Sequence, residues 1–260
     1  MQRLTLRIGR NTLAILAQDE ESDTLTYEPV VVKSGISMAA NLREAFKSSS
    51  LLSQNVSAAR VLIDSNTLMV PVELFSEQTM EEMHNHAFPR QEQDTILYNV
   101  QPDLNAVAVF AMNKDLKLVL DDHFQSIRLI AAMSPVWRHM HRRSFTGSKQ
   151  KLYAYFHEKR LELCSFQQNR FKFCNSFEAN RAPDALYFML YVWQQLQLRS
   201  KYDELCLMGD VPEKDWMMQQ LKKYVLNTIM LNPQTEYNMH PVTEIKGVPF
   251  DLQTLVVKGR

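Results

Sequence analysis

Polar and charged residues stand at the tips of two predicted β-hairpins, where their side chains could hold an anion. In the first hairpin, alternating apolar residues flank the turn Gly9-Arg10-Asn11. In the second, they flank the turn His157-Glu158-Lys159. Cationic side chains attract phosphate and carboxylate groups, but polar residues also occupy hairpin turns for conformational reasons alone. The sequence leaves both interpretations open: an anion site, or two ordinary turns.

Two pairs of histidines have the residue type that commonly binds zinc. They are His84 with His86, and His139 with His141. Both pairs lie in segments predicted as helices, where residues two positions apart point to different faces. Neither pair has a third ligand at a spacing typical of zinc sites. We therefore expect no metal site.

The three cysteines, Cys164, Cys174 and Cys206, show no spacing typical of metal or redox motifs. All three lie in apolar runs that are predicted as strands. The sequence therefore predicts reduced, buried thiols.

Other charged groups fit structural roles as well as chemical ones. Asp64 ends a predicted strand, where a carboxylate can act as a general base or cap a turn. The basic run at 137–143 ends a predicted helix, where cations complement the helix dipole.

Lys plus Arg and Asp plus Glu number 29 each, so no surplus of positive charge indicates a nucleic-acid partner. No spacing assembles a hydrolase triad, and we assign no catalytic residue.

The same order of predicted elements occurs twice along the chain. Three strands precede residue 34, a helix follows at 34–49, and a strand follows at 59–64. The later copy has three strands within 151–177, a helix at 182–198 and a strand at 203–210. We expect the strands at 4–8 and 152–156 to lie at equivalent central positions of two sheets.

This internal duplication predicts two domains, residues 1–145, with an insertion at about 66–103, and residues 150–260. Residues 144–150 are polar and are predicted to link them.

The segment 251–259 is predicted as a late strand. The helix at 183–198 is so apolar that we expect it to be almost wholly buried, with one side against another element. A second copy of the chain, giving a homodimer, is one candidate for that element.

The repeated order resembles the actin-like ATPase superfamily, which includes sugar kinases, heat-shock chaperones, actin and actin-like subunits of bacterial pilus and secretion machines. The stretches that carry the resemblance are LTLRIGRNTLAILAQD, VPVELF, the AVAVFAM…LVLDDHF run, and FCNSFEANRAPDALYFMLYVWQQL followed by ELCLMGD. They also resemble a bacterial family of unknown function that is assigned this fold. The resemblance implies an α/β, ribonuclease H-like fold with two similar halves, each containing β-β-β-α-β, and a cleft between them.

The resemblance also implies where a nucleotide site would lie. Active members carry an acid in the first hairpin that orders Mg²⁺ through water, and glycines that bring backbone N–H groups to phosphate. Here Arg7 stands at the acid's place and only Gly9 matches, while the second hairpin reads FHEKR, without glycine. Gly209, after a buried strand, matches the adenosine-side loop. The candidate cofactor-binding residues implied in this way are Gly9, Arg10, Asn11, His157, Glu158, Lys159, Gly209 and Asp210.

The absence of an acid from its expected place in both hairpins predicts a catalytically degenerate protein that binds no cofactor and acts by binding another macromolecule. The alternatives are a divergent kinase or ATPase that uses ATP and Mg²⁺, and a sensor that binds a nucleotide without hydrolysing it.

The N-terminal residues alternate in polarity and include Arg3, unlike a signal peptide. No apolar run is long enough to span a bilayer. We therefore expect a cytoplasmic protein.

Overall fold

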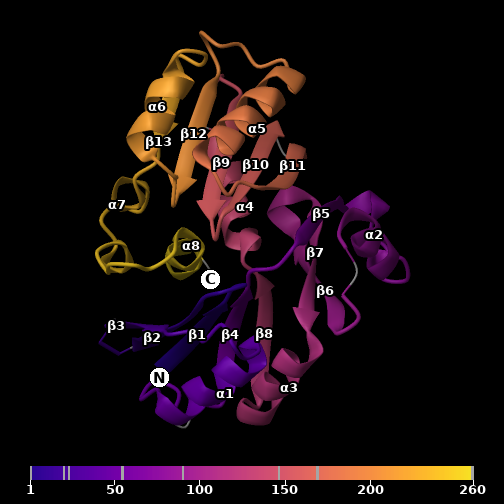
Figure 1. Cartoon of the computed structure of the whole chain (residues 1–260), viewed down its shortest axis with the longest axis vertical. Helices are drawn as coiled ribbons and strands as arrows, with labels where there is room; N and C mark the ends of the chain where they lie inside the picture. The colour runs from indigo at the N-terminus through magenta and orange to yellow at the C-terminus, as the bar shows by residue number, and fades with distance from the viewer. Residues whose placement is uncertain are drawn as a thin grey trace. The chain divides into compact units, whose positions relative to one another are not determined.

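The computed structural model of the chain describes residues 2–19, 21–22, 24–53, 56–89, 91–145, 147–167 and 170–258 (Figure 1). It contains two compact units. The first comprises Met1–Gln101, Ala106–Ser134 and Glu244–Leu252, and the second Pro102–Asn105, Pro135–Thr243 and Gln253–Arg260. Each unit is therefore assembled from segments that are far apart in the sequence. The division into 1–145 and 150–260 follows the sequence repeat and stays a prediction.

A five-stranded sheet forms the centre of the first unit, in the order β3-β2-β1-β4-β8. Its strands are β1 (Gln2–Ile8), β2 (Leu13–Asp19), β3 (Leu25–Val30), β4 (Ala58–Ile63) and β8 (Ser126–Ala131). The central strand β1 pairs antiparallel with β2 and parallel with β4. Leu4, Leu6 and Ile8 on one face of β1 are buried, and so are Thr5 and Arg7 on the other. Both faces of this strand are therefore covered.

Two helices of the first unit, α1 (Met38–Ser48) and α3 (Lys114–His123), pack against each other (Figure 1). Each begins with a side-chain cap, which satisfies a backbone N–H that the helix leaves unpaired. Ser37 accepts a hydrogen bond from the N–H of Ala40, and Asn113 accepts one from the N–H of Leu116. The caps fix where both helices start.

A smaller, three-stranded sheet with the order β5-β7-β6 also belongs to the first unit. Its strands are β5 (Thr67–Pro71), β6 (Asp94–Gln101) and β7 (Ala106–Asn113). The 3₁₀ segment η1 (Val72–Leu74) follows β5, and η2 (Pro102–Leu104), which follows β6, belongs to the second unit. The helix α2 (Met80–Ala87) covers this sheet, with Met80 and Met83 against Val70, Val107 and Val109. Strands β5 and β6 lie within the insertion predicted at about 66–103, whereas β7 follows it.

The second unit contains a five-stranded sheet in the order β11-β10-β9-β12-β13. Its strands are β9 (Lys151–His157), β10 (Arg160–Gln167), β11 (Arg170–Glu178), β12 (Glu204–Gly209) and β13 (Asn227–Met230). The central strand β9 pairs antiparallel with β10 and parallel with β12, as β1 does with β2 and β4. The predicted order β-β-β-α-β is confirmed in both copies, and so are the central positions of 4–8 and 152–156.

The remaining helices follow α3 along the chain. They are α4 (Met133–Ser144), α5 (Ala182–Gln195), α6 (Lys214–Lys222), α7 (Pro233–Glu236) and α8 (Phe250–Lys258), with the 3₁₀ segment η3 (Pro241–Thr243). The helices α5 and α6 contact each other, and their apolar faces join the core of the sheet. This core includes Leu152, Leu205, Met189, Trp193 and Leu221.

Two predictions about individual segments are wrong. The segment 251–259 is predicted as a strand, but its described residues belong to helix α8. Leu252 and Leu255 are buried at helical spacing, and this contact outweighs the strand preference of the valines that follow. Helix α5 is not almost wholly buried, because Tyr187 and Tyr191 are 62% and 47% exposed. A partner for this exposed side stays a prediction.

Within the described ranges, no helix combines the length and apolar character needed to cross a bilayer.

Candidate functional site

The turn of the first hairpin is closed by its backbone. The N–H of Gly9 donates to the carbonyl of Thr12 at 2.8 Å. Arg10 and Asn11 are exposed at the tip, and Nη2 of Arg10 donates to Oδ1 of Asn66 at 2.8 Å. This turn therefore presents a cation and an amide to solvent, and their assignment as anion ligands stays a prediction.

Arg7, just before this turn, is the centre of a buried ion-pair cluster in the first unit. Its Nη2 lies 2.7 Å from Oδ2 of Asp64 and 2.8 Å from Oδ2 of Asp251. Its Nε lies 2.9 Å from both carboxylate oxygens of Asp251, and its Nη1 donates to Oγ1 of Thr12 at 2.8 Å. Both carboxylate side chains are almost fully buried. One guanidinium thus uses all three of its nitrogens, and its two carboxylate partners are shielded from water.

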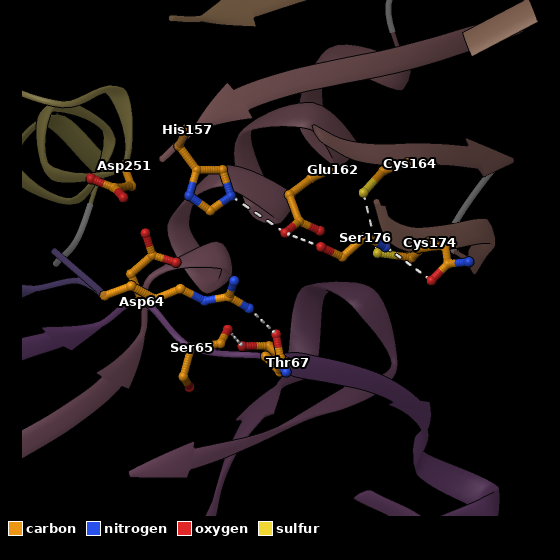
Figure 2. Close-up of polar contacts among 12 residues, drawn as sticks. Asp64, Ser65, Thr67, His157, Glu162, Cys164, Cys174, Ser176 and Asp251 are labelled. Carbon is orange, nitrogen blue, oxygen red and sulfur yellow. Dashed lines mark hydrogen bonds and ion pairs between the residues drawn. The ribbon is translucent and has the colours of Figure 1, made fainter. Parts of the chain in front are cut away.

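The local fold explains how Asp64 and Asp251 (both labelled in Figure 2) come to Arg7. Arg7 is opposite Leu62 in the parallel pairing of β1 with β4, so Asp64 follows β4 at the same edge of the sheet. Its N–H donates to the carbonyl of Ile8 at 2.9 Å, which extends that pairing by one residue. Asp251 comes from the first turn of α8. Three distant segments therefore supply one charged cluster.

Tyr27 on β3 belongs to the same surroundings. Burial raises the pKa of Tyr27; Asp251 adds to this rise, and the positive charge of Arg7 opposes it. Its hydroxyl donates to the carbonyl of Gly247 at 3.1 Å. Tyr27 is thus neutral at physiological pH and attaches the segment 244–252 to the edge of the sheet.

The turn of the second hairpin joins β9 to β10. Glu158 and Lys159 both have left-handed backbone, with φ of 43° and 63°, which is the conformation of a two-residue type I′ turn. Such turns favour asparagine and glycine, so this sequence accepts some backbone strain at the tip. The predicted binding role of these two side chains is not tested by their geometry.

His157, the last residue of β9, is buried and belongs to a polar network of the second unit (Figure 2). Its Nε2 lies 3.3 Å from Oε1 of Glu162, and Oγ of Ser176 donates to the same oxygen at 2.9 Å. The carboxylate therefore stands between histidine and serine. In a hydrolase triad the histidine takes the middle place, because it must receive the proton of the serine. The order seen here is typical of a structural network.

Gly209 is the last residue of β12 and Asp210 follows it; both are exposed. Gly209 has a φ of +81°, and a Cβ atom added there would overlap the carbonyl oxygen of Phe156 and approach the ring of Tyr155. The N–H of Asp210 donates to that same carbonyl at 2.9 Å. The close approach of two backbones is thus sufficient reason for glycine at 209. An adenosine-side role for the two residues stays a prediction.

A second charged cluster, which the sequence did not predict, lies in the second unit. Nε2 of His139 is 3.2 Å from Oε2 of Glu236, and Nη1 of Arg143 is 2.8 Å from Oε1. Nζ of Lys258 lies 2.9 Å from Nδ1 of His139. Since an ammonium can only donate, His139 is neutral here, with its proton on Nε2 toward the carboxylate. Burial lowers the pKa of His139, against the opposing effect of Glu236.

The four histidines of the two pairs have different surroundings. His84 is buried, and its Nε2 lies 3.1 Å from the carbonyl oxygen of Asn66, while His86 is exposed. His139 belongs to the cluster just described, and His141 packs edge-on against Phe145 and Phe166. In the part of the chain that the structure describes, no three His, Cys, Asp or Glu side chains are placed to hold a metal ion.

Solved structures establish the fold. A Bacteroides thetaiotaomicron protein with an actin-like ATPase fold and unknown function is 26% identical, with a TM-score of 0.85 over 94% of this chain and 96% of that one. A chain of the PilM–PilN type IV pilus biogenesis complex is 12% identical, with a TM-score of 0.56 over 98% of this chain and 94% of that one. The comparison with curated proteins gave no match. The expected actin-like ATPase fold is therefore confirmed.

The family follows from the sequence match, which spans most of the chain. The model of one family, described as protein of unknown function, matches residues 1–228. These residues include both hairpins, the strand that ends at Gly209, and all eight candidate residues. The chain belongs to the DUF3822 family of proteins of unknown function.

Proposed function

We propose that this chain is a catalytically inactive protein of the actin-like ATPase fold that acts by binding a protein partner. The observation that carries the proposal is the buried cluster of Arg7 with Asp64 and Asp251. It occupies the end of β1, where active members of the fold carry the acid that orders Mg²⁺.

The groups in this cluster do not fit a magnesium-bound phosphate. Phosphoryl transfer uses a metal that bridges phosphate oxygens and neutralises their charge. A guanidinium cannot hold a metal ion, and this one already binds both oxygens of Asp251 and Oδ2 of Asp64. Both carboxylates are thus paired with Arg7, and removing the Arg7 side chain would leave two negative charges buried together.

The second hairpin supports the same conclusion from its backbone. A loop that binds phosphate presents bare N–H groups, for which glycine is suited because it has no side chain. Here the turn consists of Glu158 and Lys159, preceded by His157, whose ring stacks on Tyr155 with centroids 4.7 Å apart. Side chains stand where a phosphate would approach the backbone.

A protein partner is the class that the comparisons favour. The similar chain from pilus biogenesis was solved as part of a PilM–PilN complex, so a scaffold of this topology can serve in a protein assembly. The charge balance of 29 basic and 29 acidic residues gives no support for nucleic acid as the partner.

The proposal is tested first by measuring phosphate release from Mg-ATP, with wild-type protein beside the variants Arg7→Asp and Glu158→Ala. We expect no release above the buffer rate. A wild-type turnover that disappears in Glu158→Ala would overturn the proposal and make Glu158 a shifted metal-ordering acid.

Thermal unfolding with and without Mg-ATP separates the inactive protein from a nucleotide sensor. A ligand present at one hundred times its Kd stabilises the folded state by about 2.7 kcal/mol. We expect no shift of the unfolding midpoint at millimolar Mg-ATP. A shift of several degrees without phosphate release would replace this proposal by the sensor.

The protein partner is tested by crosslinking in the native cells and reconstitution of the identified pair from purified proteins. We expect a complex that survives gel filtration and does not depend on added nucleotide. Failure of every crosslinked candidate to bind the purified chain would contradict the binding role.

A further inference from the structure

Cys164 and Cys174 lie directly opposite each other on neighbouring strands of the second sheet. They form one register pair of the antiparallel ladder between β10 and β11, and their Sγ atoms are 3.2 Å apart (Figure 2). Both are free thiols in this structure. Their separation by ten residues matches no sequence motif, so the strand pairing alone brings the two sulfur atoms together.

The backbone of such a pair already has the geometry that a disulfide requires. Directly opposite residues of an antiparallel ladder have Cα atoms roughly 4.5–5.5 Å apart, and disulfides span Cα separations of roughly 4.4–6.8 Å. A sulfur–sulfur bond is about 2.05 Å long. The two sulfur atoms therefore need to approach by about 1 Å, which side-chain rotation can provide without moving the strands.

We propose that Cys164 and Cys174 form a reversible cross-strand disulfide when the chain meets a peroxide. The thiolate of Cys174 attacks one peroxide oxygen, the O–O bond breaks, and Cys174 becomes a sulfenic acid. The leaving hydroxide takes up the proton that the Cys174 thiol released on ionisation and departs as water. The sulfur of Cys164 then attacks the sulfenic sulfur; the S–S bond forms, and a second water leaves with the proton of Cys164. Two thiols are oxidised, and one hydrogen peroxide is reduced to two waters.

Exposure decides which thiol reacts first. Cys174 on the edge strand β11 is only partly buried, while Cys164 is fully buried. Peroxide therefore reaches Cys174, and Cys164 acts as the resolving thiol from 3.2 Å away. Cys206 is buried in β12 and is opposite Tyr153 and Ile229 in the ladder, so it serves as an internal control.

The surroundings of Cys174 set the pH dependence of the reaction. The hydrogen bond with Cys164, burial, and the nearby carboxylate of Glu162 raise the pKa of Cys174 well above 9, while Trp137 acts in the opposite direction. Since the thiolate is the reacting form, its fraction grows with pH throughout the range below that pKa. We expect the oxidation rate to rise nearly tenfold for each pH unit between 7 and 9.

Trypsin makes the disulfide directly measurable. Cleavage after arginine and lysine places Cys164 in the peptide 161–170, Cys174 in 173–181 and Cys206 in 202–214. The full chain is treated with hydrogen peroxide, its remaining thiols are blocked, and the digest is analysed by mass spectrometry without reductant. We expect 161–170 joined to 173–181 with the loss of two hydrogens, monomeric chain on a non-reducing gel, and Cys206 blocked as a free thiol. Dithiothreitol should reverse the link.

Two variants sharpen the test. Cys206→Ser should leave the linked peptide unchanged, whereas Cys174→Ser should abolish it and leave Cys164 reduced. The proposal is overturned if peroxide links separate chains, oxidises Cys206 as fast as Cys174, or yields only sulfinic acid at Cys174. It is also overturned if all three thiols stay free at pH 9.

Discussion

Arg7 and Asp251 are 244 residues apart in the sequence, and their side chains form a buried ion pair with a nitrogen–oxygen distance of 2.8 Å. Asp64 shares the same guanidinium at 2.7 Å. The cluster holds one positive and two negative charges where water is excluded, so its members depend on each other. Replacing one member of the cluster should therefore change the free energy of unfolding by a measurable amount.

Replacing Arg7 by methionine should lower the free energy of unfolding by about 3–5 kcal/mol. The substitution leaves two carboxylates buried without their counter-ion, which is the costly way to break a buried pair. Chemical denaturation measures the loss. The matched control is Lys33→Met, because Lys33 pairs with Glu44 on the surface and such pairs contribute about 1 kcal/mol or less. Equal losses in the two variants would contradict the buried role of Arg7.

Gly209→Ala should destabilise the chain by about 3 kcal/mol or more. The new Cβ overlaps the carbonyl of Phe156, and the backbone has a φ of +81°, so strain and overlap add. Gly35→Ala is the matched control, since no atom lies within 4 Å of its added Cβ, and we expect a change within about 1 kcal/mol. A Gly209→Ala protein with wild-type stability would show that this close approach does not exist in solution.

His139 should make stability depend on pH in mildly acidic solution. Burial lowers the pKa of His139 below 6.5, so the unfolded chain binds more protons than the folded chain as the pH falls below 6.5. The stabilising contribution is complete above pH 6.5 and is lost as the pH falls toward the folded-state pKa.

Denaturation curves at several pH values between about 5 and 6.5 test the contribution of His139. We expect the variant His139→Gln to reduce the slope of stability against pH in this range, whereas the control His86→Gln, at an exposed histidine, should keep it. Glu236, whose pKa is lowered by His139 and Arg143 against the effect of burial, titrates below this range. Parallel slopes for wild type and His139→Gln would rule out His139 as the source.

Lys159→Gly should raise the free energy of unfolding by about 0.5–1 kcal/mol. Lys159 has a φ of 63°, which costs an ordinary residue about 1–2 kcal/mol and costs glycine little, and the greater freedom of unfolded glycine offsets part of the gain. The control is Lys172→Gly in strand β11, where glycine should destabilise. A loss of stability in both variants would contradict the type I′ turn.

The elements of the sheets were predictable from the sequence because their residues alternate or repeat locally. The alternation of Leu4, Leu6 and Ile8 identifies β1, and the helical spacing of apolar residues such as Met189 and Trp193 identifies α5. The partners of Arg7 were not predictable. Asp251 lies in a segment whose adjacent valines, Val256 and Val257, favour a strand, and no local pattern indicates a contact with residue 7.

The same limit applies to the cysteines and to the second charged cluster. The pairing of Cys164 with Cys174 depends on the register of β10 and β11, which includes a bulge near Ser165. His139 and Lys258 are 119 residues apart. Spacing along the chain indicates a functional site only when its residues are close in the sequence. The residues of these two clusters come from separate helices and strands.

The position of Asp251 in the first unit also determines the order in which that unit can be completed during synthesis. Ribosomes add roughly 5–20 residues per second, so Arg7 emerges on the order of tens of seconds before Asp251 is made. Throughout this interval β1 carries an arginine that has Asp64 alone for a carboxylate partner. A nascent or prematurely terminated chain that ends before residue 251 therefore carries Arg7 without one of the two carboxylates that pair with it in the folded first unit.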